Sequence, residues 1–268
     1  VYGNSVGSQL KGIGVNGGII NIGKDENIIS DITDIQLIGN ADKKAILYGV
    51  RAATATGIDK EEGQVNIESK SINVTVVDNA NGDLVHGISN NKGIVDFDSD
   101  ITKIVVTGAK GIGINSQKEG VVTLNANSVN LIYAGELNRG YGKSYAINAT
   151  GQSDVDLTAG ETNLLRGAVY ASGHTDTAKT DVTLGGTSNM VLSNAYIANA
   201  GGLTNKNVIS ALYAEKGANI SLDGDYNILG TYADSNSSDL ERVVWAYDTA
   251  DIDITGLTAI STDSYDKQ

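Results

Sequence analysis

Short runs in which apolar and polar residues alternate occur along the whole chain. Alternation with a period of two is typical of a β-strand that has one buried face. Gly, Asn, Asp and Ser fill the gaps between runs, as expected of turns, and no sustained helical stripe of apolar residues occurs. The sequence therefore predicts an all-β chain. Its clearest runs are Val65 to Ile67, Ile72 to Val76, Val121 to Leu124, Val155 to Leu157, Val182 to Leu184, Ile220 to Leu222 and Ile252 to Ile254.

These runs recur in units that resemble one another. The segment from Ala211 to Leu222 aligns without a gap with the segment from Val243 to Ile254, and shorter copies begin at Ala146 and Ala168. Many units end in a third apolar run, so each unit is predicted to hold three short strands separated by turns. Weaker copies begin near Ile13, Leu47, Val85 and Ile112, and third runs include Ile104 to Val106, Val129 to Leu131, Asn163 to Leu165, Met190 to Leu192 and Tyr226 to Ile228.

Internal repeats of this length indicate a stacked architecture. One unit cannot bury its apolar face alone, whereas neighbouring units stacked about 4.8 Å apart share a continuous core. The prediction is a parallel β-helix of about eight coils with polar loop insertions, forming a single domain over residues 1–268. A β-sandwich is the alternative, but it requires hairpin turns and fewer near-identical units. Ala149, Ala171, Ala214 and Ala246 are expected to share one tight inward column.

Composition narrows the possible functions. The chain of 268 residues has 33 Gly and no Pro or Cys. The lack of Pro suits central strands, and the lack of Cys excludes disulfides and thiolate metal sites. A net charge of −13 argues against nucleic acid and anionic membranes as partners. No apolar run is long enough for a membrane-spanning helix, so membrane insertion is not predicted. No cofactor or metal is predicted either.

One column of the predicted coils is rich in aromatic side chains. A residue flanked by two inward residues of a strand faces outward, which gives Tyr48, His86, Asn148, Tyr170, Tyr213 and Trp245. Exposed aromatic rings on a rigid surface can pack on sugar rings or on a partner protein. Tyr48, Tyr170, Tyr213 and Trp245 are therefore the candidate binding residues. In the alternative interpretation the rings stack on one another or lie under a loop.

Acidic residues also alternate along strands, as at Asp96, Asp98 and Asp100. Clustered carboxylates could hold Ca²⁺, but alternating Asp residues more often form a solvated face that resists edge-to-edge aggregation. No nucleophile elbow, phosphate-binding loop or dinucleotide fingerprint occurs. The chain is therefore predicted not to be an enzyme.

The strings Ser210 to Ala214 and Ser144 to Ala149, with the Gly, Asn, Asp and Thr turns and the lack of Cys and Pro, resemble a known family. They resemble the passenger domain of a bacterial type V (monomeric) autotransporter of the adhesin type. The resemblance implies a right-handed parallel β-helix at the cell surface, exported across the outer membrane of a Gram-negative bacterium. The chain has no secretion leader, so it is expected to be a fragment of a longer passenger.

The resemblance implies adhesion as the function. The chain would attach to a surface protein or glycan of host cells or other bacteria, or would associate with copies of itself into aggregates and biofilm. Two alternatives stay open. One is an inert stalk, and the other is a polysaccharide lyase or hydrolase, which would need carboxylates and a basic residue on one concave face.

Overall fold

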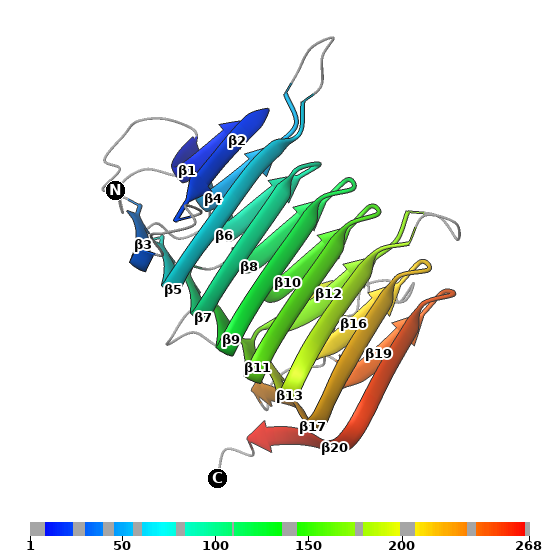
Figure 1. Ribbon diagram of the computed structural model, residues 1–268. Coiled ribbons are helices and arrows are strands. Elements are labelled where there is room, and N and C mark those ends of the chain that lie inside the picture. The colour runs from blue at the N-terminus through cyan, green and yellow to red at the C-terminus, as the bar shows by residue number, and fades with distance from the viewer. Residues whose placement is uncertain are drawn as a thin grey trace.

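The computed structural model describes residues 9–23, 30–39, 46–55, 61–78, 84–108, 110–135, 144–174, 179–198, 207–234 and 240–265. Within these ranges all regular structure is β-strand (Figure 1). No helix in them is long and apolar enough to cross a membrane. The all-β prediction is confirmed.

Two long sheets run side by side through the molecule. The first, sheet A, has the order β1(Gln9–Asn16), β4(Ile46–Ala53), β6(Leu84–Asn91), β8(Lys110–Gln117), β10(Tyr145–Thr150), β12(Ala168–Ser172), β16(Leu212–Glu215) and β19(Val244–Tyr247). The second, sheet B, has the order β2(Gly18–Ile22), β5(Gly63–Val77), β7(Ile94–Thr107), β9(Val121–Ala134), β11(Asp154–Arg166), β13(Asp181–Ser193), β17(Asn219–Asp234) and β20(Asp251–Tyr265), and β3(Ser30–Ile38) also pairs with β5.

All pairings within these two sheets are parallel, and the chain passes from one sheet to the other and back (Figure 1). Stacked parallel sheets of this kind are compatible with a β-helix or solenoid. The gapless alignment of Ala211–Leu222 with Val243–Ile254 is reproduced by the strand register, since Leu212 pairs with Val244 and Ile220 with Ile252.

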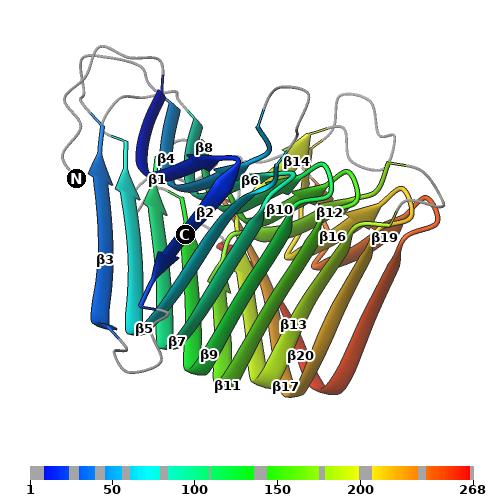
Figure 2. The same cartoon turned by 45° about the horizontal axis from the view of Figure 1, so that its top comes forward.

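The long strands of sheet B bend partway along their length (Figure 2). The second and third apolar runs of a unit, predicted as separate strands, belong to one bent strand. We call the part before the bend the first arm and the part after it the second arm. The pairing register shifts at several bends, and Gly256 adopts a φ of 85° there. The first arms are 63–69, 94–99, 121–126, 154–159, 181–186, 219–223 and 251–255, and the second arms are 71–77, 101–107, 129–134, 162–166, 188–193, 226–234 and 257–265.

The core lies between the two sheets and is filled by the inward residues of both. Phe97, the only Phe, is fully buried. The predicted alanine column is confirmed in register, with Ala149, Ala171 and Ala214 buried and Ala246 exposed on the last strand of sheet A. A glycine column in sheet A lets the two sheets approach closely: a Cβ on Gly87 or Gly113 would collide with the Ile104 or Ile132 side chain of sheet B.

A ladder of buried asparagines follows the bend on the inner side of sheet B. The Asn130 side-chain amide donates to Asn163 Oδ1 at 3.0 Å, Asn163 donates to Asn189 at 2.9 Å, and Asn189 donates to Asn227 at 3.0 Å. All four side chains are at most 1% exposed. Further bonds join the amides to strand carbonyls, such as Asn163 Nδ2 to Gly185 O at 2.8 Å. Because buried amides need partners, the ladder ties each bend to its neighbours.

Candidate functional site

The predicted aromatic column is only partly correct. Asn148, Tyr170, Tyr213 and Trp245 do share one register position across β10, β12, β16 and β19. Tyr48, however, pairs with His86, and these two belong to a different column, together with Ile112 and Tyr145. The position equivalent to Tyr170 in the earlier units is taken by polar residues, namely Arg51, Ser89 and Asn115.

The prediction that these aromatic rings form an exposed surface is wrong for Tyr48 and Tyr213. Tyr213 is 0% exposed and Tyr48 is 8% exposed, and Tyr170 and Trp245 are partly buried. A small third sheet of β14(Tyr196–Ala198), β15(Asn207–Ile209) and β18(Leu240–Glu241) supplies the cover at the C-terminal end of the column. Its Ile197, Val208 and Leu240 pack with Tyr213 and its neighbours. The alternative interpretation, that the rings stack and lie under other chain segments, is the one that holds.

Ring stacking and hydrogen bonds fix this cluster. The Tyr170 and Tyr213 rings are stacked with centroids 5.6 Å apart, and the Trp245 ring lies 5.3 Å from that of Tyr213. Both tyrosine hydroxyls donate to Glu215, at 2.8 Å and 2.7 Å. Burial would raise the pKa of the Glu215 carboxyl, but the hydroxyls of Tyr213 and Tyr170 and the charge of Lys216 hold the pKa below its usual value. This cluster therefore stabilises the outer side of sheet A.

His86 is the most unusual group on that side. It is 5% exposed, neither ring nitrogen has a hydrogen-bond partner, and its ring lies edge-on to Tyr48 at 5.4 Å. Burial, and then the charge of Arg51, lower the pKa of His86 to about 4. His86 is thus a neutral, buried imidazole at pH 7. His174, by contrast, is exposed.

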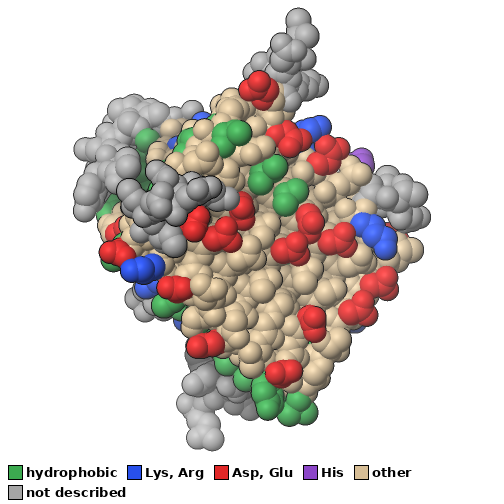
Figure 3. All heavy atoms as spheres, viewed as in Figure 1, with side chains coloured by type: hydrophobic (Ala, Val, Ile, Leu, Met, Phe, Trp, Pro, Cys, Tyr) green, Lys and Arg blue, Asp and Glu red, His purple; other side chains and the backbone are tan. Residues whose placement is uncertain are grey.

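The outer side of the first arms is polar and acidic. Figure 3 shows acidic side chains spread over this face, and its outward columns read as runs of Asp, Asn, Thr and Ser. Neighbouring strands make amide–carboxylate contacts, such as Asn125 Nδ2 donating to Asp98 Oδ1 at 3.1 Å. The columns include Asp96, Asp98, Asp154, Asp156, Asp181, Asp223, Asp251 and Asp253, with Asp96 paired to Thr123, Asp156 to Thr183 and Asp253 to Ser221.

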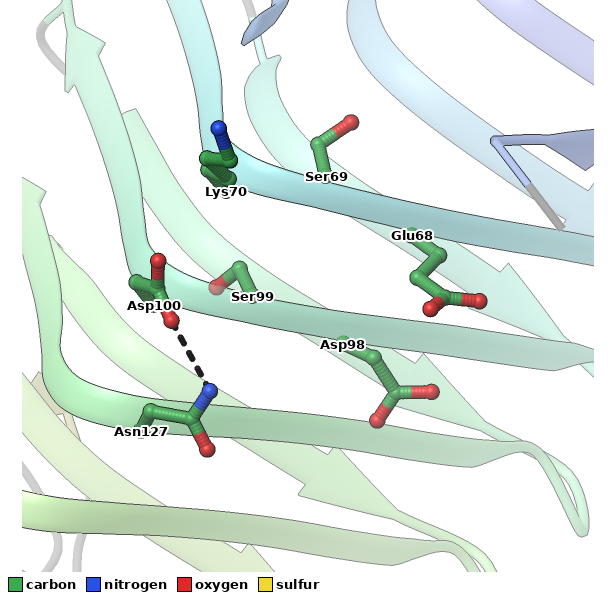
Figure 4. Close-up of a pocket in the computed structure, with 7 residues that line it drawn as sticks. All are labelled: Glu68, Ser69, Lys70, Asp98, Ser99, Asp100 and Asn127. Carbon is green, nitrogen blue, oxygen red and sulfur yellow. Dashed lines mark hydrogen bonds between the residues drawn. The ribbon is translucent and has the colours of Figure 1, made fainter. Parts of the chain in front are cut away.

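A shallow depression of about 250 Å³ lies at the bend of β5, β7 and β9 (Figure 4). Glu68, Asp98, Asp100 and Lys70 line it, and Asn127 Nδ2 donates to Asp100 at 2.8 Å. Lys70 Nζ is 2.6 Å from Asp31, so the basic group beside the carboxylates is already paired. In the described ranges, no group of three or more His, Cys, Asp or Glu side chains is placed to hold a metal ion.

The outer side of the second arms is apolar, a feature that was not predicted from the alternating pattern. One outward column reads Lys103, Leu131, Leu164, Met190 and Ile228 from β7 to β17. Several large apolar side chains on this side are exposed, namely Ile101 at 45%, Tyr226 at 56%, Ile228 at 42% and Leu257 at 72%, and Ile32 of the neighbouring strand β3 is 64% exposed. We call the outward residues of the second arms from β7 to β20 the apolar face.

A signal for this face was present in the sequence. First-arm runs alternate, as in Val155-Asp156-Leu157, whereas second-arm runs such as Met190-Val191-Leu192 are uninterrupted. A strand that is apolar at successive positions has two apolar sides, so one of them faces outward here.

No protein-family model matches the chain, and no curated protein or solved structure was found to match it.

Proposed function

We propose that this chain is a non-enzymatic adhesion module. In this proposal it is a right-handed parallel β-helix of about eight coils, part of an autotransporter-like passenger at the surface of a Gram-negative bacterium. It attaches to a protein or glycan of a host cell or another bacterium, or to another copy of itself. It acts through the outer faces of the β-helix, without a cofactor.

The observation that carries this proposal is the uncovered outer side of sheet B. The chain covers the aromatic cluster on sheet A with its own β14, β15 and β18, but on the second arms it leaves side chains such as Tyr226 and Leu257 more than half exposed. A contiguous apolar surface that is left bare commonly marks an interaction site. Long parallel strands also make the surface rigid, which lowers the entropy lost on binding.

Adhesion of coated beads tests the proposal. Beads carrying the chain should adhere to bacteria or epithelial cells, or to each other, and beads carrying albumin should not. Beads that bind neither cells nor one another under any salt condition would instead support the inert stalk. Turnover of an acidic polysaccharide that is lost in Asp98→Asn would instead support the polysaccharide enzyme.

The bead assay also distinguishes the aromatic residues first predicted to bind from the outer side of sheet B. Tyr213→Ala is expected to change adhesion only by disturbing the fold, because Tyr213 has no exposed surface. Substitutions of side chains on the outer side of sheet B are expected to change adhesion without lowering the stability of the fold.

A further inference from the structure

The apolar face is mostly apolar and carries few charges, and the only acidic residues in the second arms of β17 and β20 are Asp234 and Asp263, near the ends of the arms. On the second arms of β7, β9, β11 and β13 the only charged residues are Lys103 and Arg166. The remaining outward positions there are mostly apolar, with Thr162 and Ser188 as polar neighbours, and the apolar ones are Ile101, Val105, Val129, Leu131, Tyr133, Leu164, Met190 and Leu192. The Arg166 guanidinium lies 5.0 Å from the Tyr133 ring centre and 5.7 Å from that of Tyr232, so its charge is held against aromatic rings at the margin.

The carboxylates of sheet B are concentrated on the first arms, around the bend from this face. A chain with a net charge of −13 repels its own copies. Two copies that met through their first arms would bring rows of Asp side chains together. Two copies that met through their apolar faces would keep those rows apart and would bring no carboxylate of β7, β9, β11 or β13 into the contact.

The size of the face fits a second copy. Six strands about 4.8 Å apart, with three outward columns about 7 Å apart, give a flat area of roughly 600 Å². Two such faces together bury roughly 1,200 Å², which is the lower end of the range for specific protein–protein interfaces. Flat sheets also pack well face to face, about 10 Å apart.

We propose that the apolar face binds the same face of a second copy of this chain, forming a dimer with twofold symmetry. The contact is isologous, so one apolar surface satisfies both partners. The inference rests on the proposed function as an adhesion module, and it names the partner: a passenger on the same cell or on a neighbouring cell. An area at the lower end of the range is typical of transient rather than obligate interfaces, so the association is expected to be reversible.

Sedimentation velocity of the purified chain from about 1 to 100 μM, a range that spans micromolar affinity, tests this dimer. The test variant is Leu164→Lys with Met190→Lys, and the matched control is Thr123→Lys with Thr183→Lys on the first arms. Both change the net charge from −13 to −11 by adding two positive charges. The wild type and the control should dimerise with similar Kd, whereas the test variant should have a Kd at least tenfold higher.

Added salt sharpens the result. Apolar association should persist or strengthen at high ionic strength, because salt screens the repulsion between acidic chains. A milder variant, Leu164→Thr with Met190→Thr, replaces the test variant if urea unfolding shows that the lysines disturb the fold. A strict monomer at every concentration would overturn the inference, and so would a folded face variant that associates like the wild type.

The bead assay separates failure of the inference from failure of the proposed function. A monomer whose beads still adhere to cells refutes the dimer and leaves the adhesion proposal standing. A chain that dimerises in solution but whose beads neither aggregate nor adhere refutes adhesion and leaves the dimer standing.

Discussion

The two arms of sheet B belong to the same strands but have opposite outer surfaces. On the inner side both arms carry buried residues, as in Leu157 on the first arm and Leu165 on the second arm of β11. On the outer side the first arm of β11 carries Asp154 and Asp156, and its second arm carries Leu164. The backbone pairing is parallel in both arms, and with β13 its register shifts at the bend between Ala159 and Thr162.

This difference indicates what surrounds each surface. Packing against the core requires an apolar inner side in both arms, whereas the outer side is free to vary unless something contacts it. An outer side of Asp, Asn and Thr is suited to water. An outer side of Leu, Val, Met and Tyr is suited to a covering partner. A third surface, the outer side of sheet A, is aromatic at its C-terminal end, where the chain supplies its own cover.

Tyrosines on a covered and an uncovered surface should respond very differently to removal. Tyr213→Ala should lower the free energy of unfolding by about 4 kcal/mol, because a fully buried ring is lost together with its hydrogen bond to Glu215. Tyr226→Ala on the second arm, where the ring is 56% exposed, should cost about 0.5 kcal/mol or less in the monomer. Urea unfolding at low protein concentration measures both, and equal losses would contradict the assignment of covered and uncovered surfaces.

Acid should weaken the covered side of sheet A through His86. Its pKa is about 4 in the folded chain against 6.5 for the free side chain. Between these values the unfolded chain binds a proton that the folded chain does not. Stability is therefore complete above pH 6.5 and falls by about 3 kcal/mol as the pH drops to 4. Below pH 4 this contribution no longer changes.

The variant His86→Leu tests this assignment. It should remove the part of the stability loss that arises between pH 6.5 and 4, as followed by urea unfolding at several pH values. A loss of the same size in His86→Leu and in the wild type would assign the acid sensitivity to carboxylates instead.

Asparagines on the two sides of sheet B should also differ. Asn163→Ala should lower the free energy of unfolding by about 2 kcal/mol, because Asn130 loses its buried acceptor and Asn189 its donor. Asn125→Ala on the outer side of the first arm, where the amide is exposed, should cost about 0.5 kcal/mol or less. Thermal or urea unfolding distinguishes the two, and a tolerated Asn163→Ala would mean that the ladder does not hold the bends.

The smallest expected effect lies in the acidic columns of the first arms. Burial, and then the charges of Asp156 and Asp181, raise the pKa of Asp154 above its usual value. The ionised form is therefore disfavoured in the folded chain, and stability falls as the pH rises through this pKa. Asp154→Asn should raise stability at pH 7 by a few tenths of a kcal/mol, within the usual range for surface changes. If Asp154→Asn were less stable than the wild type at low salt, repulsion of Asp154 by Asp156 and Asp181 would be contradicted.

Much of the fold was predictable because alternation and repeats report burial directly. The column of Tyr170, Tyr213 and Trp245 follows from repeats that align without gaps. Tyr48 and His86 do not belong to that column, although Leu47-Tyr48-Gly49 and Val85-His86-Gly87 resemble Val169-Tyr170-Ala171 in sequence. In the structure Val50 and Ile88, three residues further on than Leu47 and Val85, match Val169.

The surfaces were harder to predict than the strands. The burial of Tyr213 depends on Ile197, Val208 and Leu240, which lie in or directly beside polar loop insertions and outside the repeated strands. Most of the predicted insertions fall on residues 56–60, 79–83, 136–143, 175–178, 199–206 and 235–239, which lie outside the described residues. The apolar face was not predicted, because an uninterrupted apolar run indicates a strand without showing that its second side faces outward.

Hydroxyl-radical footprinting across protein concentration tests the central claim most directly. Met190, the only methionine, and Tyr226 report on the apolar face, and Ile94 and Val121 report on the outer side of the first arms. The account predicts that oxidation of Met190 and Tyr226 falls as protein concentration rises, while oxidation of Ile94 and Val121 stays constant. Constant oxidation at all four positions, or protection confined to Ile94 and Val121, would contradict the claim that the apolar face is the surface that a second copy covers.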